Sequence, residues 1–374
     1  MSTDRRPVIV AARRTPICTR GRALAHLTVG ELAAPAIRAA LADANTLIGA
    51  PFEVADVVLG NCMGPGGNPG RVAALAAGLG TNVPGGTVDR QCGSGLAAVL
   101  DAVAAIRAGD ERVRVAGGVE SASTAPVRSM GGFHYARAPF VPAGFPDPDM
   151  TRAAEDLAAH DGISRSRQDE HAARSHSRAR AALADGRFDA ELVALDGVHR
   201  DDAIGAAEPL LPRLPTLFDG GTLTAGTATR IGDGAAALVV APAFAAPGLV
   251  VRGSAVVGCD PSLPGIGAAP AIQAALRLAD TEVGDIGAFE IVEAFAVQSL
   301  AVLDRIGLAD DDPRLCADGG ALALGHPWGA SGAIAVVRLF SRLVRSGAPA
   351  GTLGVAAASV GGGLGIAAVF EVVR

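Results

Sequence analysis

The stretch Asp89-Arg-Gln-Cys92-Gly-Ser-Gly-Leu-Ala-Ala-Val-Leu100 has a counterpart near the C-terminus, in His326-Pro-Trp-Gly-Ala-Ser-Gly-Ala-Ile-Ala-Val-Val337. In each stretch a Gly-rich turn opens an apolar helical run, and each run leads through Arg-x-Gly to a strand-like segment. An internal repeat of this kind predicts that the chain folds as two similar halves. Small residues at both helix starts let the two backbones lie close together, so we expect Cys92 and His326 to meet at one site.

Short β-rich runs alternate with Ala-rich amphipathic stretches in both halves, which is the rhythm of a mixed α/β fold. Strands are expected at residues 8–12, 54–60, 113–117, 249–257, 286–291, 352–358 and 365–373, and helices at 29–43, 70–79, 93–108, 269–278, 294–306 and 329–344. Pro-rich loops and a polar helical stretch from Ser164 to Asp185 interrupt the pattern between the halves. We therefore expect an N-terminal half of residues 1–118 plus 230–247, an inserted loop domain of residues 119–229, and a C-terminal half of residues 248–374.

Composition narrows the functional classes. The 374 residues are 49% apolar, which is enough for a large core. A net charge of -6 and an aromatic content of 3% argue against a nucleic-acid partner. The N-terminal run has neither a signal-peptide h-region nor an 18-residue span free of charge, so we expect no leader and no membrane segment. The five cysteines are an odd number without C-x-x-C spacing, which favours a reducing, cytoplasmic setting and predicts no metal site.

Cys92 and His326 are the candidate reactive groups. Cys92 follows a predicted strand end and opens a helix, where backbone N–H groups and the positive helix end lower a thiol pKa and favour the nucleophilic thiolate. A lone cysteine is about as often a small buried hydrophobe, and a lone histidine is more often structural than catalytic. Two such residues in matching motifs favour a nucleophile and its base.

Four motifs, in the same order, resemble those of the thiolase superfamily over nearly the whole chain. They are Gln91-Cys-Gly-Ser-Gly95, Asp233-Gly-Ala-Ala-Ala237, the run from Gly319 to Gly332 around His326, and the terminal Gly361-Gly-Gly-Leu-Gly-Ile-Ala367. Residues 162–179 also look like the helix of that family's inserted loop domain. The resemblance implies a five-layer αβαβα double sandwich with an inserted loop domain, assembled as a homodimer or homotetramer.

The resemblance also implies a division of roles at the site. Cys92 would take an acyl group from acyl-CoA after His326 removes its proton, and the backbone N–H groups of Cys92 and Gly361 would bind the thioester oxygen. Contacts to the pantetheine arm carry over to Met150, Phe218, Ala225, Thr229 and Phe295. Coenzyme A thioesters are then substrates, and no permanently bound cofactor is expected.

Three positions depart from the family pattern. Ser359 stands where thiolases have a second cysteine that moves a proton at the substrate Cα, and a hydroxyl is a much weaker base than a thiolate. Val292 stands where the family has an Asn or His that holds a catalytic water, and Asp149 where a His is common. These changes suggest an enzyme that forms an acyl-Cys92 intermediate and passes the acyl group to an acceptor with its own nucleophilicity, such as an activated aromatic carbon, an amine, an alcohol or a thiol.

Two alternatives stay open. One is an ordinary acetyl-CoA acetyltransferase or 3-ketoacyl-CoA thiolase in which Ser359, polarised by His326 or water, takes over the missing step. The other is a non-catalytic scaffold or partner subunit that retains the thiolase fold.

Three further predictions concern single residues or small groups. We expect His171 and His176 to lie on a solvated basic face with neighbouring arginines rather than to bind a metal. Trp328 either narrows the acyl pocket or fills a gap in the core. A group of arginines either meets the phosphates of coenzyme A or forms solvated surface: Arg152, Arg165 and Arg167.

Overall fold

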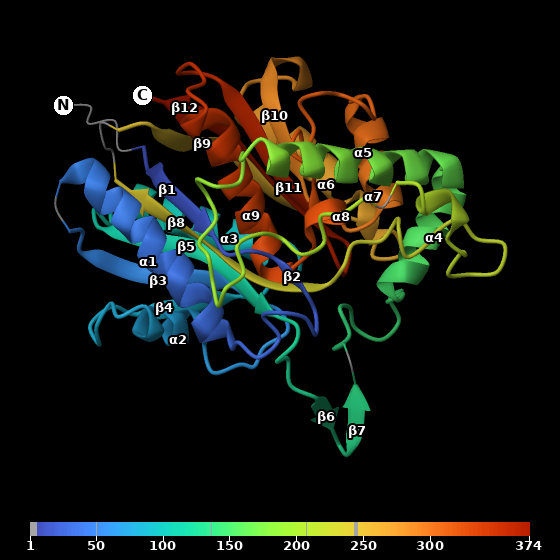
Figure 1. The fold of residues 1–374 in the computed structure, drawn as a ribbon, viewed down its shortest axis with the longest axis horizontal. Helices are drawn as coiled ribbons and strands as arrows, with labels where there is room; N and C mark the ends of the chain where they lie inside the picture. The colour runs from blue at the N-terminus through green and yellow to red at the C-terminus, as the bar shows by residue number, and fades with distance from the viewer. Residues whose placement is uncertain (1–5, 50, 136, 207, 243–245) are drawn as a thin grey trace.

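The structure is a computed structural model that describes residues 6–49, 51–135, 137–206, 208–242 and 246–374. Its described strands form one large mixed sheet and one hairpin. The strands of the large sheet are β1 (Val8–Arg14), β2 (Cys18–Thr19), β3 (Val54–Gly60), β4 (Gly85–Val88), β5 (Val113–Ser121), β8 (Gly232–Ala241), β9 (Gly248–Gly258), β10 (Ile286–Ile291), β11 (Leu353–Val360) and β12 (Leu364–Val373). Their order is β10-β11-β12-β9-β1-β8-β5-β3-β4, with β2 paired to β8 (Figure 1).

The helices are found close to where the sequence predicts them. The N-terminal half carries α1 (Val29–Ile48), α2 (Pro69–Ala76) and α3 (Ser94–Arg107), and the C-terminal half carries α6 (Ala268–Leu278), α7 (Ala296–Ile306), α8 (Ala321–Leu324) and α9 (Trp328–Leu339), which continues as a π-helical turn, Phe340–Arg345. Helix α1 shows why these boundaries form. Thr28 and Glu31 build a capping box at its start, and Gly49, with φ 75°, ends it in the left-handed region.

The predicted five-layer arrangement is confirmed. Helix α1 packs on β1, β5 and β8, and α2 packs on β3 and β4; α6 packs on β9, β11 and β12. Strands β1, β8, β5, β3 and β4 form the N-terminal part of the sheet, and β9, β10, β11 and β12 form the C-terminal part. Between the two parts lie α3 and α9, which contact each other; α9 also contacts β5 and β8 on one side and β10 and β11 on the other. The two parts are in addition hydrogen-bonded to each other, because β1 pairs with β9 at Val8 and Ile9. Strand β8 is buried along its full length because helices cover both faces.

The backbones of helices α3 and α9 lie in direct contact at Gly95 and Gly332. A Cβ on Gly95 would lie 2.7 Å from Ala333 N, and one on Gly332 would lie 2.6 Å from Leu96 N. A Cβ on Gly60, at the end of β3, would collide with the backbone of Gly95 and Gly329. No other residue type fits these contacts without a shift of the backbone. The two helix starts that carry the repeated motifs are therefore held in direct contact.

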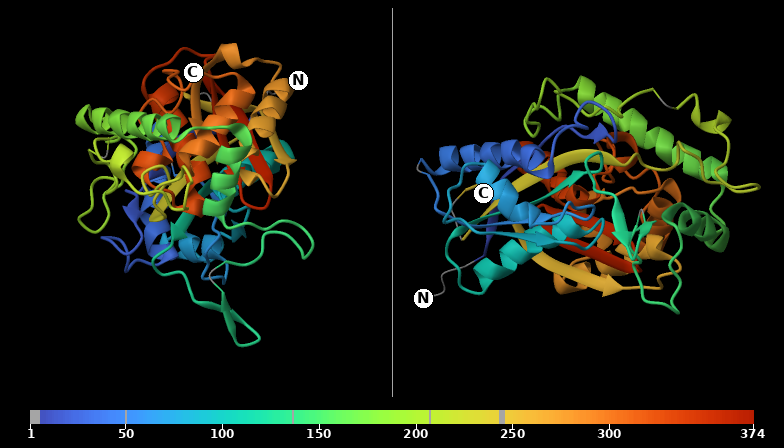
Figure 2. Two further views of the ribbon diagram at one scale, coloured as in Figure 1. Left: turned by 90° about the vertical axis from the view of Figure 1, so that its right-hand side faces the viewer. Right: turned by 90° about the horizontal axis from the view of Figure 1, so that it is seen from below.

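The insertion between β5 and β8 extends along the C-terminal half. It contains the hairpin β6 (Arg128–Met130) and β7 (Phe133–Tyr135) and two helices, α4 (Met150–Asp161) and α5 (Arg165–Ala184). Both helices pack against α7, and α5 also packs against α8. The hairpin projects away from the layers in Figure 1 and in the left view of Figure 2. The unit boundaries at residues 118/119, 229/230 and 247/248 stay a prediction.

A buried charge network joins the insertion to both halves. Arg14 of β1 donates to Glu191 Oε1 and Asp201 Oδ1 at 2.7 Å each, and Arg338 of α9 pairs with Glu191 and Asp318. All five side chains are at most 6% exposed. Buried charges are tolerated only when paired in this way.

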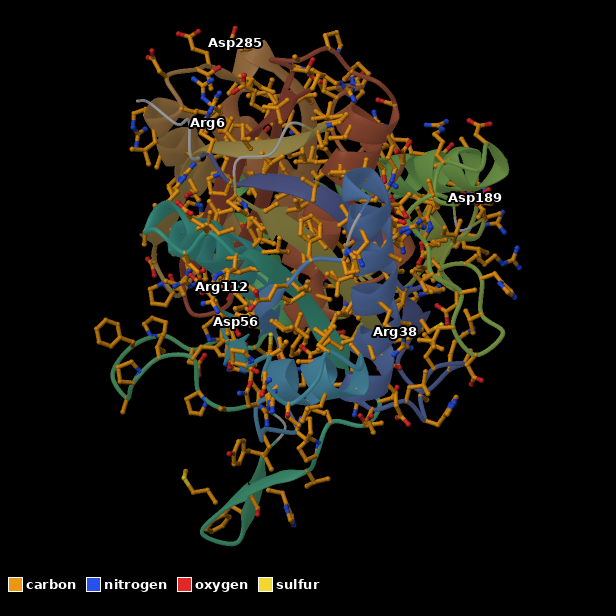
Figure 3. The ribbon with its side chains drawn as sticks, turned by 90° about the vertical axis from the view of Figure 1, so that its left-hand side faces the viewer. Arg6, Arg38, Asp56, Arg112, Asp189 and Asp285 are labelled. Carbon is orange, nitrogen blue, oxygen red and sulfur yellow. The ribbon has the colours of Figure 1, made fainter. Side chains whose placement is uncertain are left out.

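Other charged side chains lie outside the layers, among them Arg38, Arg112, Asp189 and Asp285, which are labelled in Figure 3. No helix in the described ranges is long and apolar enough to cross a membrane.

Candidate active site

The two repeated motifs bring a thiol and an imidazole together. Cys92 lies in a tight turn before α3, in which Gln91 has φ 45° and Ser94 Oγ donates to Gln91 O at 2.6 Å. His326 lies between α8 and α9, and its backbone N–H donates to Arg230 O at 2.8 Å. The distance from His326 Nε2 to Cys92 Sγ is 3.3 Å. Proton transfer between the two groups needs no rearrangement.

Ser331 sets the tautomer of His326. Its Oγ lies 2.6 Å from His326 Nδ1 and 3.0 Å from the carbonyl oxygen of Pro327. Ser331 Oγ donates its proton to Pro327 O, so the Ser331 oxygen accepts from Nδ1–H in the matching tautomer. Nε2 is then unprotonated and faces the thiol as the proton acceptor. The sequence motif contains this serine, five residues after the histidine, but sequence reasoning did not assign it a role.

Burial keeps both groups neutral. Burial raises the pKa of the Cys92 thiol to about 12, although hydrogen bonding from the backbone N–H groups of Cys92 and Gly361 lowers it. Burial alone lowers the pKa of His326 to about 4. The expectation of a thiol pKa lowered by the helix end is therefore wrong, because desolvation outweighs the backbone N–H groups. The resting pair is a thiol and a neutral imidazole.

Glu120, at the end of β5, holds the surroundings of the pair. Its carboxylate accepts from Asn61 Nδ2 at 2.9 Å, from Cys62 N at 3.1 Å, from Met63 N at 3.0 Å and from Gly329 N at 2.9 Å. Burial raises the pKa of Glu120 to about 7, although hydrogen bonds from the backbone N–H groups of Met63, Gly329 and Cys62 lower it. This one side chain joins the loop after β3 to the first turn of α9. An acidic residue at the buried end of β5 was the signal that sequence reasoning missed.

The hydroxyl of Ser359 is engaged away from His326. It donates to Gly265 O at 2.6 Å and accepts from Ala268 N, at the start of α6, at 3.0 Å; Gln298 Nε2 lies 3.4 Å away. Both nitrogens of His326 are occupied by Cys92 and Ser331, so the imidazole has no free position for Ser359. The serine oxygen therefore acts as a cap for α6.

A cavity of ≈ 390 Å³ opens beside Cys92 and His326, and we name it the main cavity. Ser359, Gly361 and three of the predicted pantetheine contacts line it: Met150, Thr229 and Phe295. Thr229 Oγ1 donates to Ala321 O at 2.6 Å, which leaves its lone pairs available. Phe218 and Ala225 are not in the lining; Phe218 lies under the guanidinium of Arg152 at 5.1 Å, and Ala225 is exposed.

The other departures from the family pattern lie at different places. Val292 is buried and lines a separate internal cavity of ≈ 30 Å³, together with Ser331. Asp149 lines the main cavity and caps α4 by accepting from Thr151 N at 2.9 Å. Trp328 is half-buried and faces the main cavity, so it does not fill a gap in the core.

The two histidines of α5 are buried, so the prediction of a solvated face is wrong. His171 is 3% and His176 5% exposed, because α5 packs that face against α7 and α8. His171 Nε2 lies 3.2 Å from Glu293 Oε1, at ion-pair distance but without hydrogen-bond alignment. No group of three or more His, Cys, Asp or Glu in the described residues is placed to hold a metal ion.

The three arginines left open between phosphate contacts and solvated surface all have acidic partners. Arg165 donates to Asp169 at 2.7 Å, Arg167 to Asp304 and Asp310 at 2.6 and 2.7 Å, and Arg152 to Asp156 at 2.9 Å.

Comparison with known proteins gives matches over the whole chain. The family model described as thiolase, N-terminal domain, matches residues 7–243, and the one described as thiolase, C-terminal domain, matches residues 237–372. A 3-ketoacyl-CoA thiolase of Erwinia tasmaniensis is 40% identical, covering 97% of this chain and 98% of the relative. An acetyl-CoA acetyltransferase of Cupriavidus necator is 38% identical with the same coverage. The crystal structure of human mitochondrial 3-ketoacyl-CoA thiolase in complex with CoA superposes with a TM-score of 0.87, at 32% identity, over 99% of this chain and 98% of that chain.

Proposed function

This chain belongs to the thiolase family of acyltransferases, and we propose that it transfers an acyl group from coenzyme A through a thioester on Cys92 to an acceptor that brings its own nucleophile. The observation that carries the proposal is the 3.3 Å contact between Cys92 Sγ and Nε2 of His326. A coenzyme A thioester is the donor substrate, and no permanently bound cofactor takes part.

Acylation begins with proton transfer. His326 Nε2 takes the thiol proton as Cys92 Sγ attacks the thioester carbonyl carbon. The bond between that carbon and the sulfur of coenzyme A then breaks, and the imidazolium returns the proton to the departing thiolate, which leaves as free coenzyme A. In the second half, the acceptor attacks the acyl-Cys92 carbonyl carbon, the Cys92 sulfur leaves, and the acceptor's proton passes by way of His326 back to the thiol.

The developing oxyanion needs donors in place. The backbone N–H groups of Cys92 and Gly361, which already act on the thiol sulfur, are suited to bind it. Removing one such donor costs roughly 3–4 kcal/mol in acyl-transfer enzymes. Because these donors belong to the backbone, they need no reorganisation during the reaction.

The surroundings of Ser359 favour an acceptor that is already nucleophilic. Carbon–carbon bond formation needs a base at the substrate Cα, and the Ser359 proton is committed to Gly265 O. To act as this base, the hydroxyl would first have to lose its own proton, and its pKa is far too high for that at neutral pH without help from another group. Val292 is apolar and lines a different cavity, so it offers no second polar group.

Intact-protein mass spectrometry after incubation with acetyl-CoA tests the first half. We expect an acetyl adduct on the wild type and none on Cys92→Ala. The Ser359→Ala variant is the matched control, and its adduct should form at the wild-type rate. Absence of an adduct with acetyl-CoA and longer acyl-CoAs would contradict acyl transfer and favour a non-catalytic scaffold.

Cleavage of acetoacetyl-CoA by coenzyme A tests the second half. We expect the wild type to be nearly inactive and Ser359→Cys to be more active, because the thiol supplies the acid that protonates the leaving Cα carbanion, a contribution of about 10²–10⁴ in rate. A wild type that cleaves acetoacetyl-CoA, and loses this activity in Ser359→Ala, would instead identify an ordinary thiolase.

A second copy of the chain is the partner that we propose. Strand β4 ends the large sheet, and among the described strands only β3 pairs with it. Next to it, Val72 and Leu75 of α2 are 44% and 46% exposed. An unpaired edge beside exposed apolar side chains favours association, as a homodimer or homotetramer. Sedimentation velocity should give a dimer or larger, and a monomer at micromolar concentration would contradict this.

A further inference from the structure

A second cavity lies against the main cavity, and one wall separates them. The second cavity has a volume of ≈ 210 Å³ and does not reach Cys92. The two cavities share five lining residues: Met63, Gln91, Arg137, Phe140 and Trp328. We infer that the two large aromatic members of this wall, Phe140 and Trp328, limit the acyl group on Cys92 to short chains such as acetyl and propionyl. This inference rests on the proposed acyl transfer.

Phe140 is fixed against the backbone that would bind the thioester oxygen. A Cβ on Gly361 would lie 2.7 Å from Phe140 Cε2, which shows how closely the ring packs on that glycine. The guanidinium of Arg137 lies over the ring, 4.3 Å from its centroid. Asp147 holds both residues, because it accepts from Arg137 Nη1 at 2.7 Å and from Phe140 N at 3.2 Å. The ring is therefore clamped on its backbone side and on one face.

The backbone of Trp328 is held by its place in the chain. It is the first residue of α9 and lies two positions after His326. The next residue, Gly329, donates its N–H to the buried carboxylate of Glu120 at 2.9 Å. The indole is thus attached to a first turn that cannot move without breaking the contacts of the base.

The position of the acyl carbon points the alkyl group at this wall. With the carbonyl carbon on Cys92 Sγ and its oxygen toward the N–H of Gly361, one direction is left for coenzyme A and one for the alkyl group. Met150 and Phe295, which suit a pantetheine arm, lie along the main cavity. The alkyl group then faces Phe140, whose ring contacts Gly361.

The second cavity is a poor alternative for an alkyl chain. Arg128, Tyr135 and Asp89 line it in addition to the shared residues. Burying methylene groups against charged side chains desolvates those charges, which costs free energy. A chain that bypasses the wall therefore gains little, and the wall sets the limit.

Competition between acetyl-CoA and octanoyl-CoA for Cys92, followed by intact-protein mass spectrometry, tests the inference. We expect the wild type to form the acetyl adduct at least about 100-fold faster, because each excluded methylene is worth a large factor in a closed pocket. Phe140→Ala should raise the ratio of octanoyl to acetyl adduct at least about ten-fold. Trp328→Leu, which keeps an apolar first residue in α9, should do the same and serves if Phe140→Ala does not fold.

Phe145→Ala is the matched control, because Phe145 belongs to the same loop, is 61% exposed and lines neither cavity. Its ratio should equal that of the wild type. Equal acetyl and octanoyl rates in the wild type, or an unchanged ratio in both folded wall variants, would overturn the inference while leaving acyl transfer intact. No adduct from either donor would overturn acyl transfer and the inference with it.

Discussion

Replacement of Ser331 by alanine removes the hydroxyl that holds His326 in its basic tautomer. The lost hydrogen bond is worth about 0.5–1.5 kcal/mol, and the buried Nδ1–H left without a partner costs about 1–3 kcal/mol in stability. The Pro327 carbonyl still accepts from the backbone N–H groups of Ala330 and Ser331. A bias of about 1.4 kcal/mol is ten-fold in the population of the active tautomer. The imidazole ring also loses its fixed orientation, which slows the reaction further. The combined effect should not exceed about 10² in rate, the lower end of what a general base contributes. We therefore expect acylation of Cys92 to slow by about 10- to 100-fold.

The assay is single-turnover acylation by acetyl-CoA at pH 7, with rapid quenching and intact-protein mass spectrometry, next to a thermal melt. Ser299→Ala is the control: its hydroxyl is also buried, at 3% exposure of the residue, but it has no hydrogen-bond partner. This control should acylate at the wild-type rate and melt no lower than the wild type. A folded Ser331→Ala protein that acylates as fast as the wild type would refute the assignment of the tautomer.

Three further outcomes are expected. The rate of acylation should fall as pH drops through about 4, where His326 becomes protonated. Because the thiol pKa is about 12, alkylation of Cys92 by iodoacetamide should rise about ten-fold per pH unit from pH 7 to 10. Peptide mass spectrometry follows both rates, and an alkylation rate that reaches a plateau near pH 8 would contradict the neutral pair. The folded-state pKa of Glu120, about 7, lies above its ordinary value of 4.5, so the folded chain binds that proton more tightly and its free energy of unfolding should fall as pH rises from 4.5 to 7. In urea titrations the Glu120→Gln variant should lack this part of the fall. Identical pH profiles of the variant and the wild type would contradict the raised pKa of Glu120. Arg338→Met removes a positive charge that pairs with Glu191 and Asp318 in the buried network, and it should lower the free energy of unfolding by about 3–5 kcal/mol. A loss below about 1 kcal/mol in the same urea titration would show that the network is hydrated.

The sequence was sufficient for the architecture. The alternation of short strands and Ala-rich helices predicted the layers, and the repeated turns at Cys92 and His326 predicted that two helix starts meet. Both predictions depend on local patterns, namely periodicity and the small residues at close backbone contacts. The insertion between β5 and β8 was likewise visible as a change in composition, and β8 returns to the N-terminal part of the sheet as expected.

The sequence was not sufficient for the environment of individual groups. The thiol pKa of Cys92 depends on how completely the surrounding layers exclude water, which the helix start alone does not report. His171 and His176 looked solvated because arginines surround them in the sequence, yet the packing of α5 buries them. The partners of Ser359 come from the start of α6, about 90 residues away in the chain. Contacts of such separation leave no periodic signal.

The backbone contact between α3 and α9 has a consequence for how this chain can change over evolutionary time. Side chains elsewhere in the core can be exchanged as long as total volume is kept, and each exchange shifts its neighbours slightly. At Gly95 and Gly332 there is no side chain to exchange, so the spacing of the two helix starts does not follow those shifts. Drift in the rest of the core is therefore uncoupled from the distance between sulfur and imidazole. The residues around the cavity can diverge toward new acceptors while the acylating pair stays in register.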